Sequence, residues 1–434
     1  MIVLLCILVI GWSPPECISL DPLDDCEPAI TGDGLGNVWV SWVNSGKLCT
    51  RYWNGNQWSE VMLIDSIGVT SPCMDKGPTG NPWIVWNSET VIKTAVYDGS
   101  TWVVIPTSFG SAWLPQINGN PLWITWMEST AGGTIFASFY DWGFGWSCPD
   151  TVTYILPCYC VKSHAMAADT AANIWVVLRY HGGLYAKFSG DGWQDSMTVV
   201  TGEASAFHTM TVDSVGKIWV SFYTGVDIYA SYYDGVEWSL STLVCSTTEY
   251  PYRLNSTTDG LGTVWIAWSA GNIPCDIFVS YYTPAQWITS PLDTCPSDDR
   301  DVCITTDIQG CVWAAWTSNR DGDYNIYVSH TEAQGVNEIT QFSNSECQLQ
   351  VYPNPFSERV DIIFNIEQRP YDRIKNTESK IYNVSGKLVK KFNRESSMAW
   401  DGTDNSGNRL PSGVYFLKFQ AGDYSATEKL LLIR

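Results

Sequence analysis

Residues 33–42 read Asp-Gly-Leu-Gly-Asn-Val-Trp-Val-Ser-Trp, a tight-turn signal that leads directly into a short apolar stretch. An Asp side chain can cap backbone N–H groups, and a Gly three residues later tolerates a positive φ, so the first four residues predict a hairpin turn. In the following six, apolar side chains occupy both alternating faces, which is typical of a strand buried on both sides. The stretch therefore predicts a hairpin whose second strand lies in a core.

The same stretch recurs along the chain. Seven copies share a Trp inside a short apolar strand, and these leading Trp residues are Trp39, Trp83, Trp123, Trp175, Trp219, Trp265 and Trp313. The intervals between them are 44, 40, 52, 44, 46 and 48 residues. A period in the forties is that of the four-stranded blades of a β-propeller. In the fifth copy, we expect strands over 207–212, 218–223, 227–233 and 236–243.

We therefore predict an all-β protein, a seven-bladed β-propeller followed by a small immunoglobulin-like β-sandwich. The recurring Trp residues are interpreted as fillers of the space between blades. The Asp residues of the turns are interpreted as turn formers rather than as metal ligands or catalytic groups.

Composition divides the 434 residues into two domains. The formal net charge is −24 before residue 349 and +3 from there onward, and Trp400 alone of the 23 Trp lies after residue 348. We expect the propeller over 21–348 and the sandwich over 349–434, a length that suffices for seven short strands. The acidic larger part argues against a nucleic-acid partner, because phosphate binding needs clustered Lys and Arg.

The N-terminal sequence predicts an export signal. Residues 2–10 form an unbroken apolar run that is too short to span a bilayer and fits the core of a signal peptide. We predict a signal peptide over 1–20 and no transmembrane segment in the mature chain; a buried first strand is the alternative. Cys17 lacks the small neighbours of a lipid-anchor site.

Fourteen cysteines are compatible with an oxidising exterior, and their spacing favours disulfides over zinc. The pairing stays open. The candidates are Cys275, Cys295, Cys303, Cys311 and Cys347.

The repeat resembles a known group of proteins. Residues 233–238 read Tyr-Asp-Gly-Val-Glu-Trp, and related hairpins follow the Trp strands of other copies. Together these patterns resemble exported bacterial propellers of the sialidase-like and TolB-like types, and residues 318–327 look like the TolB-type repeat. The resemblance covers about residues 25–345 and implies a scaffold without implying an activity.

The C-terminal segment has a different resemblance. Residues 351–356 read Val-Tyr-Pro-Asn-Pro-Phe, a hairpin is expected over 381–389, and residues 410–416 read Leu-Pro-Ser-Gly-Val-Tyr-Phe. This succession resembles the type A C-terminal sorting domain of type IX secretion system cargo and, more loosely, the immunoglobulin-like domain of the flagellar hook-capping protein. The resemblance implies that the type IX secretion machinery handles residues 349–434 and that the protein is secreted or displayed on the outer cell surface. The alternative is a structural sandwich with no sorting role.

A ligand site is expected at the mouth of the propeller channel, where the innermost strand of each blade begins. His164 and His208 each precede a turn Asp by five residues, while Glu27, Arg253 and Asp301 precede theirs by six. The predicted ligand-binding residues are Glu27, Trp113, His164, His208, Arg253 and Asp301. Acid–base chemistry would use His164, His208 or Arg253. The alternative is that the two histidines are polar residues lining the channel.

Two functions remain open from the sequence. The first is a non-catalytic binding or adhesion module for a glycan or a surface protein. The second is an extracellular polysaccharide lyase or glycoside hydrolase whose site is at the channel mouth. Neither the arginine pattern of a sialidase nor a Gly-x-Ser-x-Gly elbow is present. No cofactor is predicted; residues 321–323 and 401–408 resemble calcium loops, but they lack the full spacing and are interpreted as turns.

Overall fold

The computed structural model of the protein describes most of the chain. The described residues are 11–19, 23–107, 109–110, 112–119, 121–128, 134–154, 164–169, 171–180, 183–189, 193, 198–202, 207–271, 274–283, 286–293, 295–332, 347–352, 359–366, 377–383, 387–393, 397–405, 407–421 and 424–433. The chain divides into two compact units, residues 1–335 and 336–434. Within the described ranges, no helix has the length and apolar character needed to cross a membrane.

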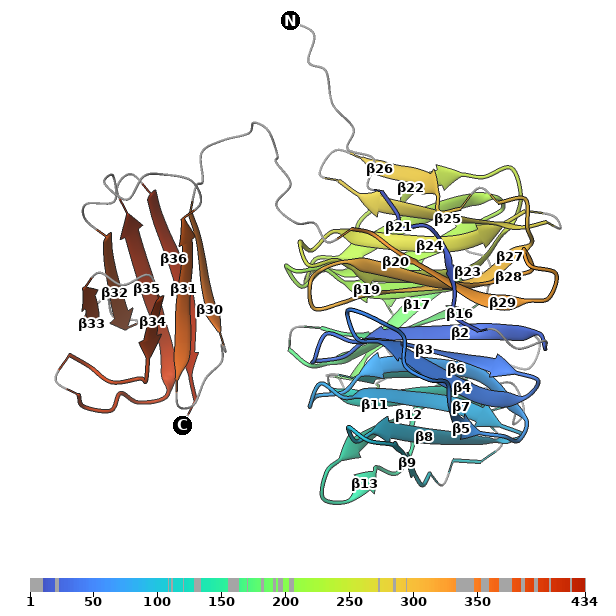
Figure 1. Cartoon of the computed structure of the whole chain (residues 1–434), viewed down its shortest axis with the longest axis horizontal. Helices are drawn as coiled ribbons and strands as arrows, with labels where there is room; N and C mark the ends of the chain where they lie inside the picture. Colours follow the sequence, from blue (N-terminus) through green and yellow to red (C-terminus); the bar gives the residue numbers. More distant parts are fainter. Residues whose placement is uncertain are drawn as a thin grey trace, which may run out of the picture. The chain divides into compact units, whose positions relative to one another are not determined.

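The first unit consists of antiparallel sheets (Figure 1). The first sheet holds β2 (Asp25–Gly32), β3 (Val38–Asn44), β4 (Lys47–Trp53) and β5 (Met62–Asp65), and the second holds β6 (Val69–Lys76), β7 (Pro82–Ser88), β8 (Val91–Tyr97) and β9 (Trp102–Ile105). The third holds β10 (Ala112–Gly119), β11 (Leu122–Glu128) and β12 (Thr134–Asp141), which pairs with both β13 (Gly145–Trp146) and β14 (Asp150–Tyr154). The fourth holds β15 (His164–Ala168), β16 (Ile174–Tyr180), β17 (Gly183–Phe188) and β18 (Thr198–Thr201), and the fifth holds β19 (His208–Val212), β20 (Ile218–Thr224), β21 (Asp227–Tyr233) and β22 (Thr242–Ser246). The sixth holds β23 (Pro251–Thr258), β24 (Val264–Ala270), β25 (Asp276–Tyr282) and β26 (Trp287–Pro291), and the last holds β27 (Asp299–Thr306), β28 (Val312–Ser318), β29 (Asn325–His330) and, from the N-terminus, β1 (Glu16–Cys17).

The sheets form a closed succession. Their first strands contact one another in the order β2, β6, β10, β15, β19, β23 and β27, and β27 contacts β2 again. Each first strand is thus the innermost strand of its sheet, and the following strands lead outward. This arrangement is a β-propeller.

The fourth strand of the fifth copy begins later than predicted. We expected a strand over 236–243, whereas β22 begins at Thr242. The intervening residues form a hairpin turn in which Ser231 Oγ donates to the Ser239 carbonyl at 2.8 Å and Tyr232 N donates to Ser239 Oγ at 3.0 Å. Backbone pairing also continues there, from Ser239 N to the Tyr232 carbonyl at 2.8 Å and through a bridge between Tyr233 and Trp238, so the side-chain hydrogen bonds add to it before β22 begins.

The turn Asp residues are confirmed as turn formers, and each also holds the leading Trp. In the sixth copy, Asp259 Oδ1 accepts from Leu261 N at 2.9 Å and from Thr263 N at 2.8 Å, while Oδ2 accepts from Trp265 Nε1 at 2.9 Å. The indole bond recurs between Asp33 and Trp39, Asp169 and Trp175, Asp213 and Trp219, and Asp307 and Trp313. One carboxylate therefore fixes both the hairpin and the rotamer of the Trp that fills the space between sheets.

The leading Trp residues fill the space between neighbouring sheets, as predicted. Trp39, Trp83 and Trp265 are at most 1% exposed. In most junctions a second Trp, from the hairpin between the third and fourth strands of the next sheet, packs edge-on against the first. These pairs are Trp39–Trp102, Trp83–Trp146, Trp175–Trp238, Trp219–Trp287 and Trp313–Trp58, with centroids 5.5–6.4 Å apart and planes at 82–87°. T-shaped aromatic pairs add about 0.5–1.5 kcal/mol beyond the area that they bury.

The second unit has two antiparallel sheets. One contains β30 (Cys347–Tyr352), β31 (Val360–Ile366) and β34 (Ser397–Trp400); the other contains β33 (Leu388–Asn393), β32 (Thr377–Asn383), β35 (Gly413–Ala421) and β36 (Tyr424–Leu432). Val360 and Trp400 from the first sheet share a core with Ile381, Leu417 and Leu430 from the second. The two sheets therefore pack face to face.

The predicted signal segment overlaps the fold. Residues 1–10 lie outside the described part of the chain, but β1 pairs with β29 through Glu16 and Val328, and Ile18 is fully buried. The alternative expectation, that the apolar run 2–10 is a buried first strand, concerns residues outside the described part of the chain.

The expected disulfides are not found among the described candidates. Cys275, Cys295, Cys303 and Cys311 carry no disulfide bond, and the Cys347 side chain lies outside the described residues. Cys303 is instead a buried core residue whose Sγ donates to the Ala315 carbonyl at 3.6 Å.

Candidate functional site

A repeated backbone irregularity marks the beginning of the innermost strands. In β2, β6, β10, β23 and β27, the pairing with the second strand shifts at a β-bulge. One residue in each bulge has a positive φ: Glu27 at 50°, Ser71 at 51°, Leu114 at 49°, Arg253 at 47° and Asp301 at 53°. A non-glycine residue in this region costs roughly 1–2 kcal/mol, and bulges re-aim side chains at the rims of barrels and at binding sites.

Three of the predicted site residues occupy this bulge position. Arg253 and Asp301 lie on neighbouring innermost strands and form an ion pair, with Arg253 Nε 3.1 Å from Asp301 Oδ1. The Arg253 side chain is half exposed, so the pair contributes little to stability and its guanidinium stays open to solvent. Glu27 of β2 contacts the innermost strand of the following sheet, β6, where its Oε2 accepts a hydrogen bond from Ser71 N at 2.5 Å.

The thiol of Cys26 lies within the field of the same charges. Its pKa is raised to about 11, chiefly by burial and then by the carboxylates of Glu27 and Asp301, while Arg253 opposes the shift. The structure therefore brings Glu27, Arg253 and Asp301 into one electrostatic neighbourhood with a protonated thiol at its edge.

The two histidines do not join this group. Both are 4% exposed. His164 Nε2 lies 2.8 Å from Thr125 Oγ1, and His208 Nε2–H donates to the Val177 carbonyl at 3.1 Å. His164 and His208 each lie one residue nearer to their turn Asp than the bulge residues lie to theirs. Leu254, which has the equivalent position in β23, is buried as well. A one-residue offset along a strand turns a side chain to the opposite face, so counting back to the turn placed them too near the rim.

Burial also removes the acid–base chemistry that was expected of these rings. The pKa of His164 is lowered to about 3, chiefly by burial and then by the charge of His208. Burial likewise lowers the pKa of His208 to about 4, assisted by Arg179. Both imidazoles are therefore neutral at physiological pH and are sealed from a solvent-borne substrate.

Aromatic side chains accompany the charges at the beginning of the innermost strands. Trp113 of β10, one of the predicted ligand-binding residues, is 37% exposed. Tyr250 and Tyr252, which flank the start of β23 beside Arg253, are exposed as well and were not singled out from the sequence. Their signal was available: two Tyr residues around Pro251 stand immediately before a strand that carries an arginine.

A second aromatic site was missed. A cavity of about 110 Å³ lies beside the last sheet; its lining is Ser13, Pro14, Glu16, Trp53, Trp313, Val328 and His330. The His330 ring stacks on Trp313, with centroids 4.3 Å apart. In five of the six other copies the residue paired with the leading Trp in this register is Tyr or Phe, as with Tyr52, Tyr232 and Tyr281, whereas the second copy has Val96. The histidine at this repeat position, where most other copies have Tyr or Phe, was the sequence signal for this cavity.

The loops that resemble calcium sites are held by hydrogen bonds within the protein. Asp321 Oδ2 accepts from the Tyr327 hydroxyl. Asp404 accepts from Asn408 N at 2.9 Å and from Asn408 Nδ2 at 3.1 Å. No group of three His, Cys, Asp or Glu residues is placed to hold a metal ion within the ranges described above.

Comparison with known proteins identifies the C-terminal segment. Residues 350–433 match the family described as "Secretion system C-terminal sorting domain". The protein is therefore secreted through the type IX system to the cell surface or beyond. No curated protein matches the chain.

Solved structures resemble the fold. A fungal alcohol oxidase, solved in complex with copper, is 13% identical with a TM-score of 0.54, and the match covers 98% of this chain and 100% of that one. The virginiamycin B lyase of Staphylococcus aureus is 13% identical with a TM-score of 0.51, over 74% of this chain and 99% of its own. A lectin of Aleuria aurantia, described as a six-bladed β-propeller with a fucose recognition mode, is 14% identical with a TM-score of 0.44, over 64% and 96%. At these identities the likeness concerns the fold alone.

Proposed function

We propose that the protein is a seven-bladed β-propeller of the exported sialidase-like and TolB-like type. It acts outside the cell as a non-catalytic module that binds a glycan or a surface protein at the mouth of its channel. Seven sheets within the described part of the first unit, and the closed succession of their first strands, support the blade count. The two facing sheets of the second unit support an immunoglobulin-like sandwich over 349–434, the segment through which the type IX machinery would act.

One observation carries the proposal: an aromatic and a cationic side chain face solvent at the mouth, whereas the two histidines suited to proton transfer are buried. Trp113 and Arg253 are open to solvent, while His164 and His208 are sealed and neutral. An exposed indole offers a flat apolar face to a sugar ring or a side chain, and a guanidinium offers a fork of donors to hydroxyl or carboxylate oxygens.

The strained backbone supports the same location. Each bulge holds its residue in a conformation that the chain would otherwise avoid, and such residues cluster at ligand-binding sites. The equivalent bulges of β2, β23 and β27 display Glu27, Arg253 and Asp301 from three neighbouring sheets. A charged ligand group would thus meet a preformed arrangement rather than one that must be ordered on binding.

The test is a binding panel on the purified exported protein. We expect the wild type to retain at least one bacterial or host polysaccharide, or a protein from a surface extract, and we expect Trp113→Ala and Arg253→Ala each to weaken that binding about tenfold or more. Phe144→Ala is the matched control, because Phe144 is an exposed aromatic in the hairpin at the opposite end of its sheet.

Turnover measurements decide between binding and catalysis. The same polysaccharides are incubated with the wild type and assayed for new reducing ends and for the unsaturated products of a lyase. Release of either product, lost in His164→Asn or His208→Asn variants that still fold, would establish the alternative lyase or hydrolase. Unchanged binding by both the Trp113 and the Arg253 variants would move the site away from the channel mouth.

A further inference from the structure

The cavity at the junction of the last and first sheets lies where the aromatic packing of the repeat changes. In four other junctions, a Tyr from the third strand of the following sheet packs on the leading Trp with ring centroids 4.5–5.1 Å apart. These pairs are Trp39–Tyr97, Trp83–Tyr140, Trp175–Tyr233 and Trp219–Tyr282. The last junction has Trp53 in the place of this Tyr, and its ring centroid lies 6.5 Å from that of Trp313. Both of these Trp residues line the cavity of about 110 Å³.

The second departure from the repeat at this junction is His330. It pairs with Trp313 across the strands, and its Nδ1 lies 2.9 Å from the Thr331 carbonyl oxygen. A carbonyl oxygen can only accept a hydrogen bond, so Nδ1 carries the proton, and Nε2 of the neutral ring is an acceptor. The Tyr or Phe that most other copies have at this position offers no such nitrogen.

The N-terminal segment supplies a carboxylate to the same cavity. Ser13 N donates to the His330 carbonyl at 2.8 Å, and Ser329 Oγ donates to the Ser13 carbonyl at 2.7 Å, so this segment is fixed against β29. Glu16, three residues further on, is exposed and lines the cavity. Among the residues that the structure describes, no hydrogen bond or ion pair engages the Glu16 carboxylate.

Arg51 is the cation that acts on Glu16, and it is engaged elsewhere. Burial lowers the pKa of Arg51, and the charge of Glu16 opposes that shift. Arg51 Nη1 nevertheless donates to the Ile18 carbonyl at 2.8 Å, and its guanidinium carbon lies over the Trp58 ring, 5.6 Å from the centroid. The Glu16 carboxylate is therefore available to a ligand.

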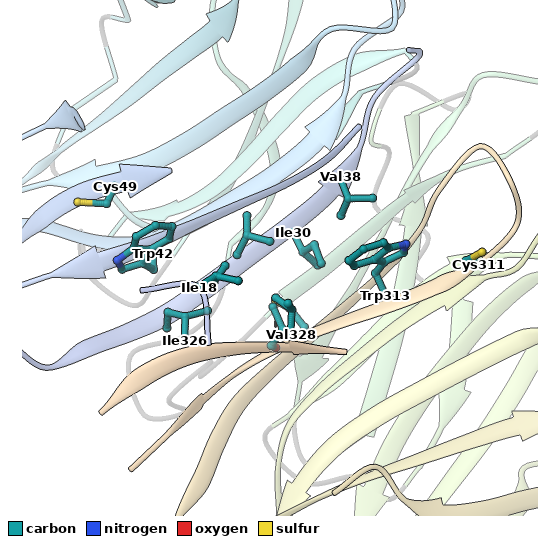
Figure 2. Packing of buried hydrophobic residues seen from close by; sticks show 12 residues of the cluster. Ile18, Ile30, Val38, Trp42, Cys49, Cys311, Trp313, Ile326 and Val328 are labelled. Carbon is teal, nitrogen blue, oxygen red and sulfur yellow. Dashed lines mark hydrogen bonds between the residues drawn. The ribbon is translucent and has the colours of Figure 1, made fainter. Parts of the chain in front are cut away.

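Apolar side chains form the inner side of the cavity. Trp313 and Val328 belong to the buried cluster where the last and first sheets meet, which Figure 2 shows together with Ile18 of the N-terminal segment. Trp53 packs against this cluster and is only partly buried. An indole ring attracts a cation that lies over its face within about 6 Å. The cavity thus combines aromatic side chains with a carboxylate and an imidazole acceptor.

The size and charge of the cavity restrict its ligand. Pockets that hold drug-sized ligands measure about 300–1,000 Å³, so a cavity of about 110 Å³ takes one short group. The polar groups that remain open are acceptors, and the chain before residue 349 has a formal net charge of −24, so a cationic donor is favoured. A lysine side chain meets both conditions, because it carries a compact ammonium with three donors on a slender apolar stem.

We propose that this cavity binds the ammonium group of a lysine side chain that a partner protein presents. The ammonium donates to the Glu16 carboxylate and to His330 Nε2, and the carbon chain of the lysine lies against Trp53. None of the residues that line the cavity belongs to the group at the channel mouth, so the inference does not rest on the function proposed there.

The test is a ligand-observed NMR titration of the exported protein with Nα-acetyl-lysine amide, whose only charge is the ε-ammonium. We expect a dissociation constant on the order of 1 mM, and binding at least about tenfold weaker for Nα-acetyl-norleucine amide, which has the carbon chain without the ammonium. Equal binding of the two compounds, or no binding of the lysine compound at about 10 mM, would overturn the proposal. Tighter binding of glucosamine would overturn the lysine assignment in favour of an amino sugar. An exported chain that begins after Glu16 would lack the carboxylate and would also overturn the proposal.

Three variants locate the binding of the lysine compound. Glu16→Gln keeps the shape of the side chain but removes its charge, so we expect binding about fivefold weaker or more. His330→Phe removes the acceptor and installs a ring that the repeat itself uses at this position, as in Phe139, so the variant should fold and also bind about fivefold more weakly. Glu60→Gln is the matched control, because Glu60 is exposed and acts on Arg51 as Glu16 does but does not line the cavity. Unchanged binding by both Glu16→Gln and His330→Phe, or an equal loss in Glu60→Gln, would contradict the proposal.

Discussion

Replacement of Asp259 by Ala tests whether the turn carboxylates stabilise the propeller through the indoles that they hold. In the native protein this carboxylate accepts two backbone N–H groups of its turn and the Nε1–H of Trp265. Trp265 is 1% exposed, so no solvent can replace the lost acceptor without rearrangement. The mutation therefore leaves a buried donor unsatisfied.

The expected loss follows from these three bonds. An orphaned buried donor costs about 1–3 kcal/mol. The turn N–H groups lie near exposed Leu261, where water can replace the carboxylate, and together they add roughly 1 kcal/mol. We therefore expect Asp259→Ala to lower the free energy of unfolding of the first unit by about 2–4 kcal/mol, measured by urea titration with Trp fluorescence.

A matched control isolates the indole bond. Asp234 caps a hairpin turn through Val236 N at 2.9 Å and Glu237 N at 3.0 Å but contacts no indole. Asp234→Ala should therefore cost clearly less than Asp259→Ala. In a double-mutant cycle with Trp265→Phe, which removes the N–H, the coupling should be about 1–2 kcal/mol.

The second copy supplies a comparison within the chain. Gly77 stands where five other copies have Asp, and the buried Nε1 of Trp83 has no hydrogen-bond partner among the described residues. Trp83→Phe should therefore cost less than Trp265→Phe, because only the latter breaks a hydrogen bond. Equal costs for the two Trp variants, or no coupling between Asp259 and Trp265, would refute the reasoning.

Three further predictions concern other parts of the molecule. As pH falls from 6.5 to about 4, the free energy of unfolding should decrease by about 1.4 kcal/mol per pH unit for each of His164 and His208. The reason is that these rings bind protons in the unfolded chain but not when they are buried. Urea titrations across this pH range should show a smaller slope in a His164→Asn variant. Gly260→Ala should destabilise the first unit by about 1–3 kcal/mol in thermal and urea unfolding, since the new Cβ would lie 2.8 Å from the backbone of the adjoining turn. Gly202→Ala places its Cβ in open space and should change the free energy of unfolding by no more than about 0.5 kcal/mol. Deletion of 349–434 in a host with a type IX system should leave the protein inside the outer membrane in cell fractionation, and unchanged surface levels would contradict the sorting role of the tail.

The repeat could be predicted from the sequence because its chemistry is local. In four copies an Asp and a Gly three residues apart specify a hairpin in four residues, and the leading Trp follows that Asp by six residues. The same spacing that makes Asp33 a turn former also brings its Oδ2 within 2.9 Å of Trp39 Nε1, yet that second role depends on the Trp rotamer and was not visible.

The site was predicted less well because it depends on register. Glu27, Arg253 and Asp301 share the same count back to the turn, and the structure places all three in equivalent bulges. The same count, shorter by one residue, put His164 and His208 at the rim, although the strand directs them into the core. A bulge is a backbone event without a fixed sequence signature, so counting could not show where a strand changes the face that it presents.

The last sheet explains why the N-terminal segment was the hardest to place. A repeat predicts each sheet from its own copy, and within the described residues the final copy supplies only β27, β28 and β29. An unpaired β29 would be an exposed edge open to other chains, and β1 covers it. Asp25 N, at the start of β2, also donates to the Tyr324 carbonyl at 2.7 Å, so the beginning of the chain is joined to its last sheet on both sides of residues 20–22. Because these contacts span about three hundred residues, no local pattern could predict them, and opening the ring requires that all of them break together.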